Sequence, residues 1–326
     1  MIYVHSVGHF HPENVIDNQF LEELNIGTTH QWIMERVGIE SRRTVLDLGY
    51  IRETYNKNPA LAQEASEYSN AQTGALAAQM ALERMGLKPE NIGLVISGSC
   101  TPQFSCPAES CTIAKELGIE VPAFDVNSAC SSMASQLNLI NMMKPDALPE
   151  YVLLVQNENS TRHIDYGDRS SCVLWGDCAS ALIVSTQTPA RLRIEHSTFT
   201  SSPQGAEKVQ FIEHGHFTQD GRTVQTFAIK RSLAIIKELK ALSGEDEIRF
   251  IGHQANLSML QSVCTKADIR PEDHLYNVDQ FGNCGAAGAP SVLSQNWDTL
   301  RNGDRIIVGV VGGGLSWGGV LIEVEE

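Results

Sequence analysis

The 326-residue sequence has no apolar run that approaches the ~18 residues that a membrane-spanning helix needs. Its first residues, MIYVHSVGHFHPENVID, show neither the basic segment nor the apolar segment of a secretory signal, so we expect no secretion. Positive charge is also scarce, because the chain has 24 Lys and Arg but 39 Asp and Glu, which gives a net charge of -15. This balance argues against a general nucleic-acid binder. Together these absences predict a cytoplasmic protein with no membrane and no nucleic-acid partner.

Closely spaced cysteine pairs are missing as well. None of the eight cysteines forms a CxxC pair, so the spacing predicts no metal site. Without a secretory signal, free thiols fit a reducing compartment, and most of them should be small buried hydrophobes. They lie at positions 100, 106, 111, 130, 172, 178, 264 and 284.

The composition that remains is that of a globular protein, with 42% hydrophobic and 19% charged residues. Two basic clusters stand out against the acidic background. Each could line a channel for a phosphorylated cofactor, or could be a solvated helix face. Their members are Arg36, Arg42 and Arg43, and then Lys230, Arg231, Lys237 and Lys240.

The order of elements repeats in the two halves of the chain. In each half a helix precedes a short apolar strand, and a second strand, a turn of small residues, another helix and two further strands follow. In the first half these segments include 71–86, 93–99, 122–126, 127–143, 151–156 and 171–184. In the second half they are 226–244, 247–256, 275–295, 305–314 and 315–324.

This repetition predicts an α/β protein built by internal duplication, with halves of residues 1–188 and 189–326. The junction falls near Thr188–Arg191, where a proline interrupts the periodicity. Equivalent strand ends should meet at a shared interface, and α/β proteins place their sites at such carboxyl ends. The polar, Gly-rich segment 199–223 is expected to be an insertion or a loop at the mouth of the site.

Cys130 is the first candidate for chemistry. It follows a predicted strand and opens a predicted helix, among the small residues of the string NSACSS. The positive end of a helix dipole favours a thiolate, and small neighbours leave room for an acyl group at the sulfur. The alternative is a cysteine that is merely buried before a helix.

His253, Asn283 and the run Gly312–Gly314 lie at other strand ends of the duplicated plan. His253 could point into a shared cavity or could be an ordinary loop histidine. Asn283, in the second-half counterpart of the cysteine turn, could contact a ligand or support a left-handed turn. The glycines could offer N–H groups as an oxyanion hole, worth ~3 kcal/mol of barrier, or form a flexible strand exit. Because these residues occupy related positions, their functional interpretation is favoured.

The chain resembles 3-oxoacyl-acyl-carrier-protein synthase III and its secondary-metabolism relatives, in the thiolase superfamily. The resemblance extends over essentially the whole chain. Its strongest strings are HQWIMERVGIESRR (30–43), AFDVNSACSS (123–132), GHQANLSML (252–260), NVDQFGNCGAAGAPSVL (277–293) and GGGLSWGGVLI (312–322). Degradative thiolases place a second catalytic cysteine near the C-terminal glycines, where this chain has none, and elongating synthases use two histidines.

The resemblance implies a thiolase-like αβαβα five-layer duplication with two mixed sheets, assembled as a homodimer. It implies that Cys130 is the acylated nucleophile, that His253 and Asn283 assist decarboxylation, and that the N–H groups of Cys130 and Gly313 form the oxyanion hole. The coenzyme A channel would include Trp32, Arg36 and Asn256. Acyl-CoA and acyl-carrier protein would be the partners, and no cofactor beyond these thioesters is implied.

Several positions depart from the family pattern. Cys106 replaces a Phe at the acyl pocket across the dimer, so it is assigned to substrate binding with a changed or larger pocket. Ala228 and Ser258 replace basic residues expected on the carrier-protein docking face, although Lys266 is retained. The usual GDGAGA motif contains Cys178, and Asn283 is followed by Cys284 instead of Thr. These changes favour a specialised paralogue.

Three functions follow. The first is a condensing enzyme: an acyl group on Cys130 undergoes Claisen condensation with a malonyl or β-ketoacyl thioester. The second is a relative that transfers the acyl group to an oxygen or nitrogen nucleophile in natural-product biosynthesis. The third is an inactive partner subunit. The complete set of Cys130, His253 and Asn283 favours the first.

Overall fold

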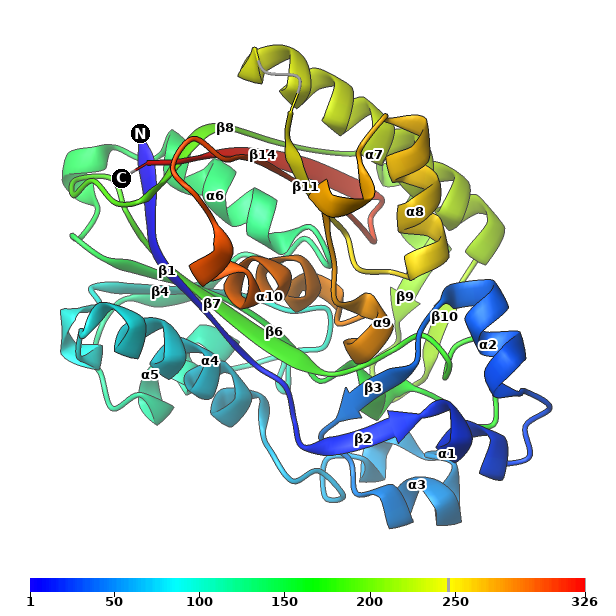
Figure 1. Ribbon diagram of the computed structural model, residues 1–326. Helices are drawn as coiled ribbons and strands as arrows, with labels where there is room; N and C mark the ends of the chain where they lie inside the picture. Colours follow the sequence, from blue (N-terminus) through cyan, green and yellow to red (C-terminus); the bar gives the residue numbers. More distant parts are fainter. Residues whose placement is uncertain (245–246, 326) are drawn as a thin grey trace.

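The computed structural model of the chain describes residues 1–244 and 247–325 (Figure 1). Within these residues one mixed sheet of ten strands forms, in the order β12-β11-β13-β14-β8-β1-β7-β6-β4-β5. The strands of this sheet are β1 (Ile2–Phe10), β4 (Leu94–Gly98), β5 (Ala123–Asp125), β6 (Val152–Glu158), β7 (Cys178–Ser185), β8 (Leu192–Ser201), β11 (Arg249–Gly252), β12 (His274–Leu275), β13 (Arg305–Gly312) and β14 (Ser316–Val324). Two smaller pairs are β2 (Asn14–Asp17) with β3 (Ser41–Thr44), and β9 (Val209–Phe211) with β10 (Phe217–Gln219).

The ten strands repeat one arrangement twice. The order β5-β4-β6-β7-β1 corresponds to the order β12-β11-β13-β14-β8. In each group the first three strands are parallel to one another. Each of the last two strands pairs antiparallel with the strand before it. Strands such as β4 and β6 are buried along their whole length, as expected for strands covered on both faces. The α/β duplication expected from the sequence is therefore present.

The expectation of two separate sheets needs a correction. β1 pairs antiparallel with β8 through Ile2–Ile194, Tyr3–Arg193 and Val4–Leu192, so the two groups of strands are continuous. These strands would otherwise be the inner edges of two sheets, and pairing satisfies N–H and C=O groups that an edge leaves open. The proposed boundary at residue 188 stays a prediction, since hydrogen bonds and a common core join the two groups.

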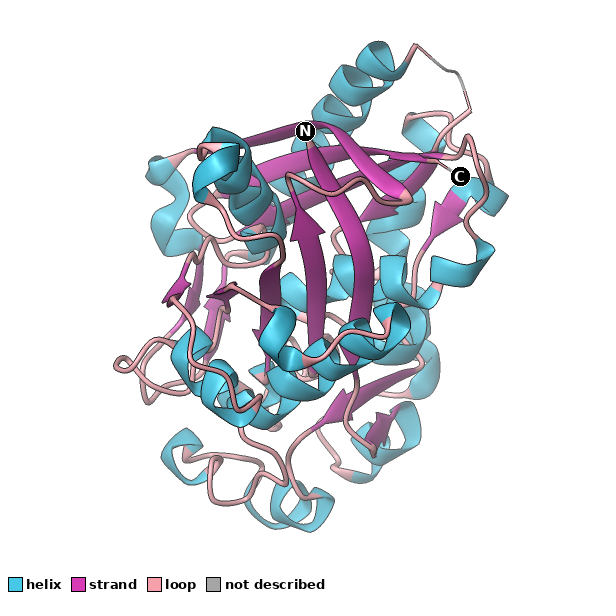
Figure 2. Ribbon diagram, turned by 90° about the vertical axis from the view of Figure 1, so that its left-hand side faces the viewer, coloured by secondary structure: helices cyan, strands magenta, loops and turns pink. Residues whose placement is uncertain are grey.

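Helices form three layers around the two groups of strands (Figures 1 and 2). α6 and α10 lie between the groups, α4 and α5 cover the first group, and α7 and α8 cover the second. The five-layer arrangement expected from the sequence is thus observed. The helices are α1 (Asn18–Glu23), α2 (His30–Val37), α3 (Leu48–Thr54), α4 (Asn70–Met85), α5 (Glu109–Glu116), α6 (Ser132–Met142), α7 (Gly221–Ser243), α8 (Leu257–Lys266), α9 (Val278–Phe281) and α10 (Gly288–Gln295). None of these helices is long and apolar enough to cross a membrane.

Two sequence expectations differ from the structure in detail. The segment 171–184 was expected to be extended throughout, but β7 begins only at Cys178, and residues 171–174 form turns. The segment 199–223 was expected to be an insertion or a loop, and it is not a plain loop, because it contains the end of β8 and the β9–β10 hairpin. In both cases tertiary contacts decide the backbone conformation, and both segments lie beside the cavity described below.

The close packing of α4 on β1 depends on small residues from both elements. α4 begins at a capping box formed by Ser69 and Gln72, and it turns an alanine-rich face towards the sheet. Gly8 of β1 lies beneath this face, and a Cβ at this position would lie 2.1 Å from the carbonyl oxygen of Ala77. The missing side chain therefore sets the distance between helix and sheet.

Replacing Gly8 by Ala should lower the free energy of unfolding by about 3 kcal/mol, because the clash is with backbone atoms that cannot rotate away. Urea unfolding measures the loss. The control is Gly221→Ala at the start of α7, where the nearest atom to a new Cβ is Gln219 Nε2 at 3.9 Å. Equal stability of the Gly8→Ala variant and the wild type would contradict this packing.

Candidate active site

Cys130 lies in a tight turn between β5 and α6. The helix begins two residues later, with Ser131 as its N-cap, so the position expected from the sequence is confirmed. Ala129, just before Cys130, has a left-handed backbone with φ of +52°, which a residue with a side chain rarely adopts. Such strain is retained where the surrounding structure determines it, and it is common at functional turns. The turn holds a thiol that is only 6% exposed.

The C-terminal glycine turn packs directly on the cysteine turn. A Cβ on Gly312 would lie 2.9 Å from the backbone nitrogen of Cys130 and 3.0 Å from that of Ser131, so only glycine allows this approach. The Ser316 hydroxyl donates to the carbonyl of Gly313 at 2.8 Å and lies 2.7 Å from the Ser131 hydroxyl. Hydrogen bonds and close packing therefore fix Gly313 relative to Cys130.

His253 and Asn283 reach the same region from the second half of the chain. His253 directly follows β11 and is 7% exposed, and its Nδ1 is buried without a hydrogen-bond partner among the described residues. Asn283 Oδ1 accepts a hydrogen bond from the Gly285 N–H at 3.0 Å, so its Nδ2 is the group left for a ligand. Cys130, His253 and Asn283 line one cavity of about 470 Å³.

The pKa of the Cys130 thiol is held well below its ordinary value. The largest cause is a hydrogen bond from the thiol of Cys100, whose Sγ lies 3.7 Å from that of Cys130. Burial acts in the opposite direction, and the charge and hydrogen bond of His253 lower the pKa further. The pKa of Cys100 is raised well above its ordinary value, chiefly by the same hydrogen bond, so Cys100 is the protonated donor of the pair.

A buried carboxyl group supports this pair of thiols. Glu158, at the end of β6, accepts hydrogen bonds from the backbone N–H of Cys100 at 2.9 Å and of Ala286 at 3.1 Å. Burial, with the nearby Cys130, raises the pKa of Glu158 to about 8. The carboxyl group thereby connects the Cys100 segment to the turn that follows Asn283. Sequence reasoning missed both Cys100 and Glu158, because their role depends on spatial neighbours far away in the sequence.

The outer part of the cavity is lined by aromatic and basic side chains. The guanidinium carbon of Arg36 lies 4.8 Å from the ring centre of Trp32, and that of Arg169 lies 5.0 Å from it. Asn256 also lines the cavity and caps α8 by accepting from the Met259 N–H at 2.8 Å. Arg169 was not identified from the sequence, although it lies in the polar string YGDRSS, whose Gly, Asp and Ser residues favour a turn or loop.

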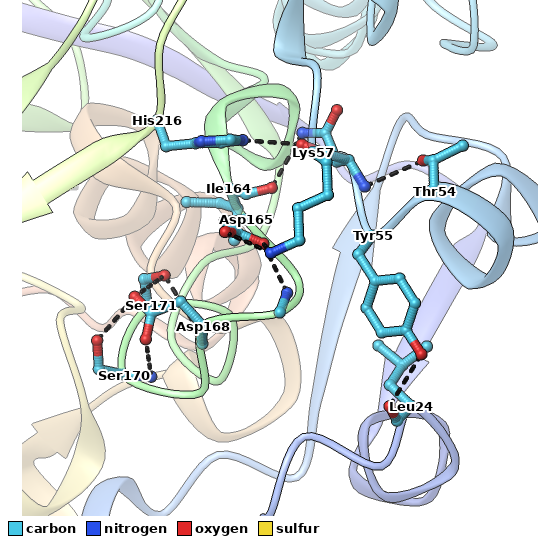
Figure 3. A network of polar contacts seen from close by, with 12 residues as sticks. Leu24, Thr54, Tyr55, Lys57, Ile164, Asp165, Asp168, Ser170, Ser171 and His216 are labelled. Atoms are coloured by element: carbon cyan, nitrogen blue, oxygen red, sulfur yellow. Dashed lines mark hydrogen bonds and ion pairs between the residues drawn. The ribbon is translucent and has the colours of Figure 1, made fainter.

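A polar network holds the loop that carries Arg169 (Figure 3). Lys57 Nζ forms an ion pair with Asp165 at 2.8 Å, and the Asp168 carboxylate accepts from the hydroxyls of Ser170 and Ser171. His216, next to β10, lies 2.8 Å through Nε2 from the carbonyl of Asn56. Asn56 and Lys57 are neighbours in the chain, so the Arg169 loop and the 199–223 segment are bound to the same short stretch of backbone. Two sides of the cavity mouth are therefore held by one segment.

Cys106 and Ala228 differ in their surroundings from the other residues assigned from the sequence. Cys106 is exposed and is not among the residues that line the cavity, so its assignment to a pocket completed by a second subunit stays a prediction. Ala228 was expected on a docking face, but it is 4% exposed and lines the cavity. The amphipathic pattern of α7 turns this position inwards. The other assigned residues, Trp32, Arg36, Asn256 and Gly313, all line the cavity.

Comparison with known proteins places this arrangement in a family. The C-terminal domain model of 3-oxoacyl-[acyl-carrier-protein] synthase III matches residues 239–324, and the family's preceding domain model matches residues 124–203. The chain is 30% identical over 341 residues to the β-ketoacyl-[acyl-carrier-protein] synthase III of Sulfurovum sp., covering 97% of this chain and 94% of that protein. The same enzyme of Aliarcobacter butzleri is 30% identical over 347 residues, covering 99% and 98%.

Solved structures agree with this match. The crystal structure of 3-oxoacyl-[acyl-carrier-protein] synthase III from Aquifex aeolicus superposes with a TM-score of 0.87 at 27% identity, over 99% of this chain and 100% of that one. The priming β-ketosynthase of the R1128 polyketide pathway shares the fold, with a TM-score of 0.84 at 24% identity over 100% and 97%. The thiolase-like fold inferred from the sequence is confirmed, and the chain belongs to the 3-oxoacyl-[acyl-carrier-protein] synthase III family.

Proposed function

We propose that this protein is a condensing enzyme that takes an acyl group onto Cys130 and joins it to a malonyl or β-ketoacyl thioester. The observation that carries the proposal is the convergence of Cys130, His253 and Asn283 on one cavity. The names of the similar enzymes, which are β-ketoacyl-[acyl-carrier-protein] synthases III, support it. The structural setting of each residue suggests its part in the reaction.

In the loading step the Cys130 thiolate attacks the carbonyl carbon of an acyl thioester. The bond from carbon to Sγ forms, the bond to the sulfur of the donor breaks, and the departing thiolate takes a proton from His253. The N–H groups of Cys130 and Gly313 are suited to the oxyanion, because the two turns are packed against one another. The lowered pKa of Cys130 favours the thiolate form that makes this attack.

In the condensing step a malonyl thioester loses CO2, and its α-carbon attacks the acyl carbon on Cys130. The new carbon–carbon bond forms as the bond to Sγ breaks, which restores the Cys130 thiolate. The enolate oxygen that develops on loss of CO2 needs hydrogen-bond donors. His253 and the Nδ2 group of Asn283 are placed to provide them, because the Asn283 oxygen is already bound to Gly285.

The donor thioester is proposed to be carried by coenzyme A or an acyl-carrier protein. Trp32 offers an aromatic face to an adenine ring, while Arg36 and Arg169 offer positive charge for phosphates at the cavity mouth. Asn256 lies farther along the same cavity wall. The basic character of this mouth contrasts with the net charge of -15 of the chain, which supports a local anion site.

We further propose that the protein is a homodimer of the cytoplasm. The edge strand β5 pairs on one side only within the described residues, and Phe124 on it is 38% exposed. Phe104, close in sequence to Cys106, is 47% exposed. Apolar side chains beside an unpaired strand edge suit a subunit interface. The eight cysteines are all free thiols, which suits a reducing compartment.

The covalent step predicts an acyl adduct on Cys130. When the protein is incubated with a panel of acyl-CoAs, intact mass should increase by one acyl group in the wild type and not in Cys130→Ser. Release of CO2 from a malonyl thioester should collapse in Asn283→Ala, which keeps the nucleophile and should still be acylated. An adduct without CO2 release from any acyl donor would favour acyl transfer to an oxygen or nitrogen nucleophile instead.

The hydrogen bond from Cys100 predicts a shift in the reactivity of Cys130. Cys100→Ala should raise the pKa of Cys130, because a charge-assisted hydrogen bond to the thiolate is lost. The pH dependence of iodoacetamide labelling, mapped to Cys130 by mass spectrometry, measures this shift. Cys100→Ser keeps a donor and should shift less, and the exposed Cys111→Ser should not shift. An unchanged midpoint in Cys100→Ala would disprove the proposed hydrogen bond.

The cavity mouth predicts a role for Arg169 in donor affinity. Arg169→Ala should raise the KM for acyl-CoA about tenfold with little change in kcat, since a cation–π contact and a phosphate partner are removed far from the reacting carbon. Steady-state kinetics measure both constants. Arg52→Ala is the matched control, because Arg52 also lies over an aromatic ring, 4.4 Å from Phe20, but outside the cavity. A fall in kcat with unchanged KM would contradict this assignment.

A further inference from the structure

Three side chains of types that can ligate metals come together from distant parts of the sequence, beside the proposed active site. They are His11, directly after β1, Cys178, the first residue of β7, and Cys284, directly after Asn283. The nitrogen and two sulfur atoms that they offer all lie within 4.8 Å of one another. The proposed condensation uses none of these side chains.

The distances between these donor atoms are close to the ligand–ligand distances of a tetrahedral zinc site. With Zn–S bonds of about 2.3 Å and Zn–N bonds of about 2.0 Å, a tetrahedral site has ligand–ligand distances of roughly 3.5–3.8 Å. His11 Nε2 already lies 3.8 Å from Cys178 Sγ. Small side-chain rotations would therefore bring all three donors to bonding distance around one ion.

The surroundings fit a thiophilic cation. Cys178 and Cys284 are each 1% exposed and pack with Ala287 and Phe281, so the sulfur atoms are shielded from water. The His11 ring stacks on Phe281 with 3.7 Å between centres and 18° between planes, which fixes its orientation. His11 is only half-buried, which gives an ion a route from solvent.

We propose that His11, Cys178 and Cys284 bind a Zn²⁺ ion, with water as the fourth ligand. Two cysteines and one histidine with an open fourth position are a known zinc ligand set, and soft thiolates disfavour magnesium or calcium. Both thiols would release their protons as the Zn–S bonds form. The absence of CxxC pairs does not bear on this site, because its donors come from positions 11, 178 and 284.

Binding would stabilise the turn that carries Asn283. Cys284 is its direct neighbour, and the backbone of Asn283 already pairs with the segment before β7 through Leu174 and Gly176. A Zn–S bond to Cys284 would add a link from this turn to β7 and to the end of β1. The inference goes beyond the proposed condensation and does not depend on it, since the ion would lie behind Asn283 and not among the reacting groups.

The experiment is a titration of the purified full-length chain, kept reduced, with Co²⁺ as a spectroscopic probe and with Zn²⁺ in competition with a chromogenic chelator. The wild type should bind one ion per chain and show thiolate-to-cobalt charge-transfer absorption, which added Zn²⁺ removes. Cys284→Ser should weaken Zn²⁺ binding by about 100-fold or more, since even an outer-shell partner contributes 10–100-fold. Cys178→Ala with Cys284→Ala should abolish the absorption.

Control variants separate this site from the other thiols. Cys130→Ser disrupts the Cys100–Cys130 pair and should keep both the absorption and the affinity, as should the exposed Cys106→Ser. The inference is overturned if the wild type shows no charge-transfer absorption, or if the absorption persists in the double variant. Should the double variant fail to fold, His11→Leu provides the second test, and an unchanged Zn²⁺ affinity in that variant would equally overturn the site.

Discussion

The packing of the Gly312–Gly314 turn on the Cys130 turn is the contact on which the proposed site depends. Each turn belongs to a different half of the chain, and neither has an oxyanion site by itself. A side chain on Gly312 would collide with the backbone nitrogens of Cys130 and Ser131, and Ser316 links both turns through Ser131 and Gly313. The duplicated sheet brings the two turns together, and the glycines allow the close approach that the proposed oxyanion hole, with one N–H group from each turn, requires.

The second constraint is electrostatic, because Cys130, the proposed nucleophile, is buried. Burial alone would raise the pKa of the Cys130 thiol, and the hydrogen bond from Cys100 outweighs it. Cys100 in turn is held through its backbone by Glu158, which also holds the turn after Asn283. Sequence reasoning attributed the reactivity of Cys130 to the helix that follows it. In the structure the largest effect on the pKa of this thiol comes from the neighbouring Cys100, so the pKa and the position of Cys130 depend on the same buried group of residues.

Sequence patterns predicted the parts of this protein that repeat. The alternation of helices and apolar strands led to the duplicated fold, and the turns of small residues led to Cys130 and Asn283. They could not reveal the β1–β8 pairing, since the alternation of side chains within a strand does not identify its neighbour in the sheet. They also missed Cys100, Arg169 and the group of His11, Cys178 and Cys284. Those residues have no distinctive spacing, and only the folded chain brings them together.

The central claim is that the acyl group on Cys130 is joined to carbon. The most direct measurement supplies an unlabelled acyl-CoA and a malonyl thioester with ¹³C at all three malonyl carbons, and analyses products by mass spectrometry. Condensation predicts a β-ketoacyl thioester that retains two labelled carbons, together with labelled CO2, and neither product with Cys130→Ser. Transfer of the acyl group to an oxygen or nitrogen acceptor, with no label incorporated and no labelled CO2, would contradict the account.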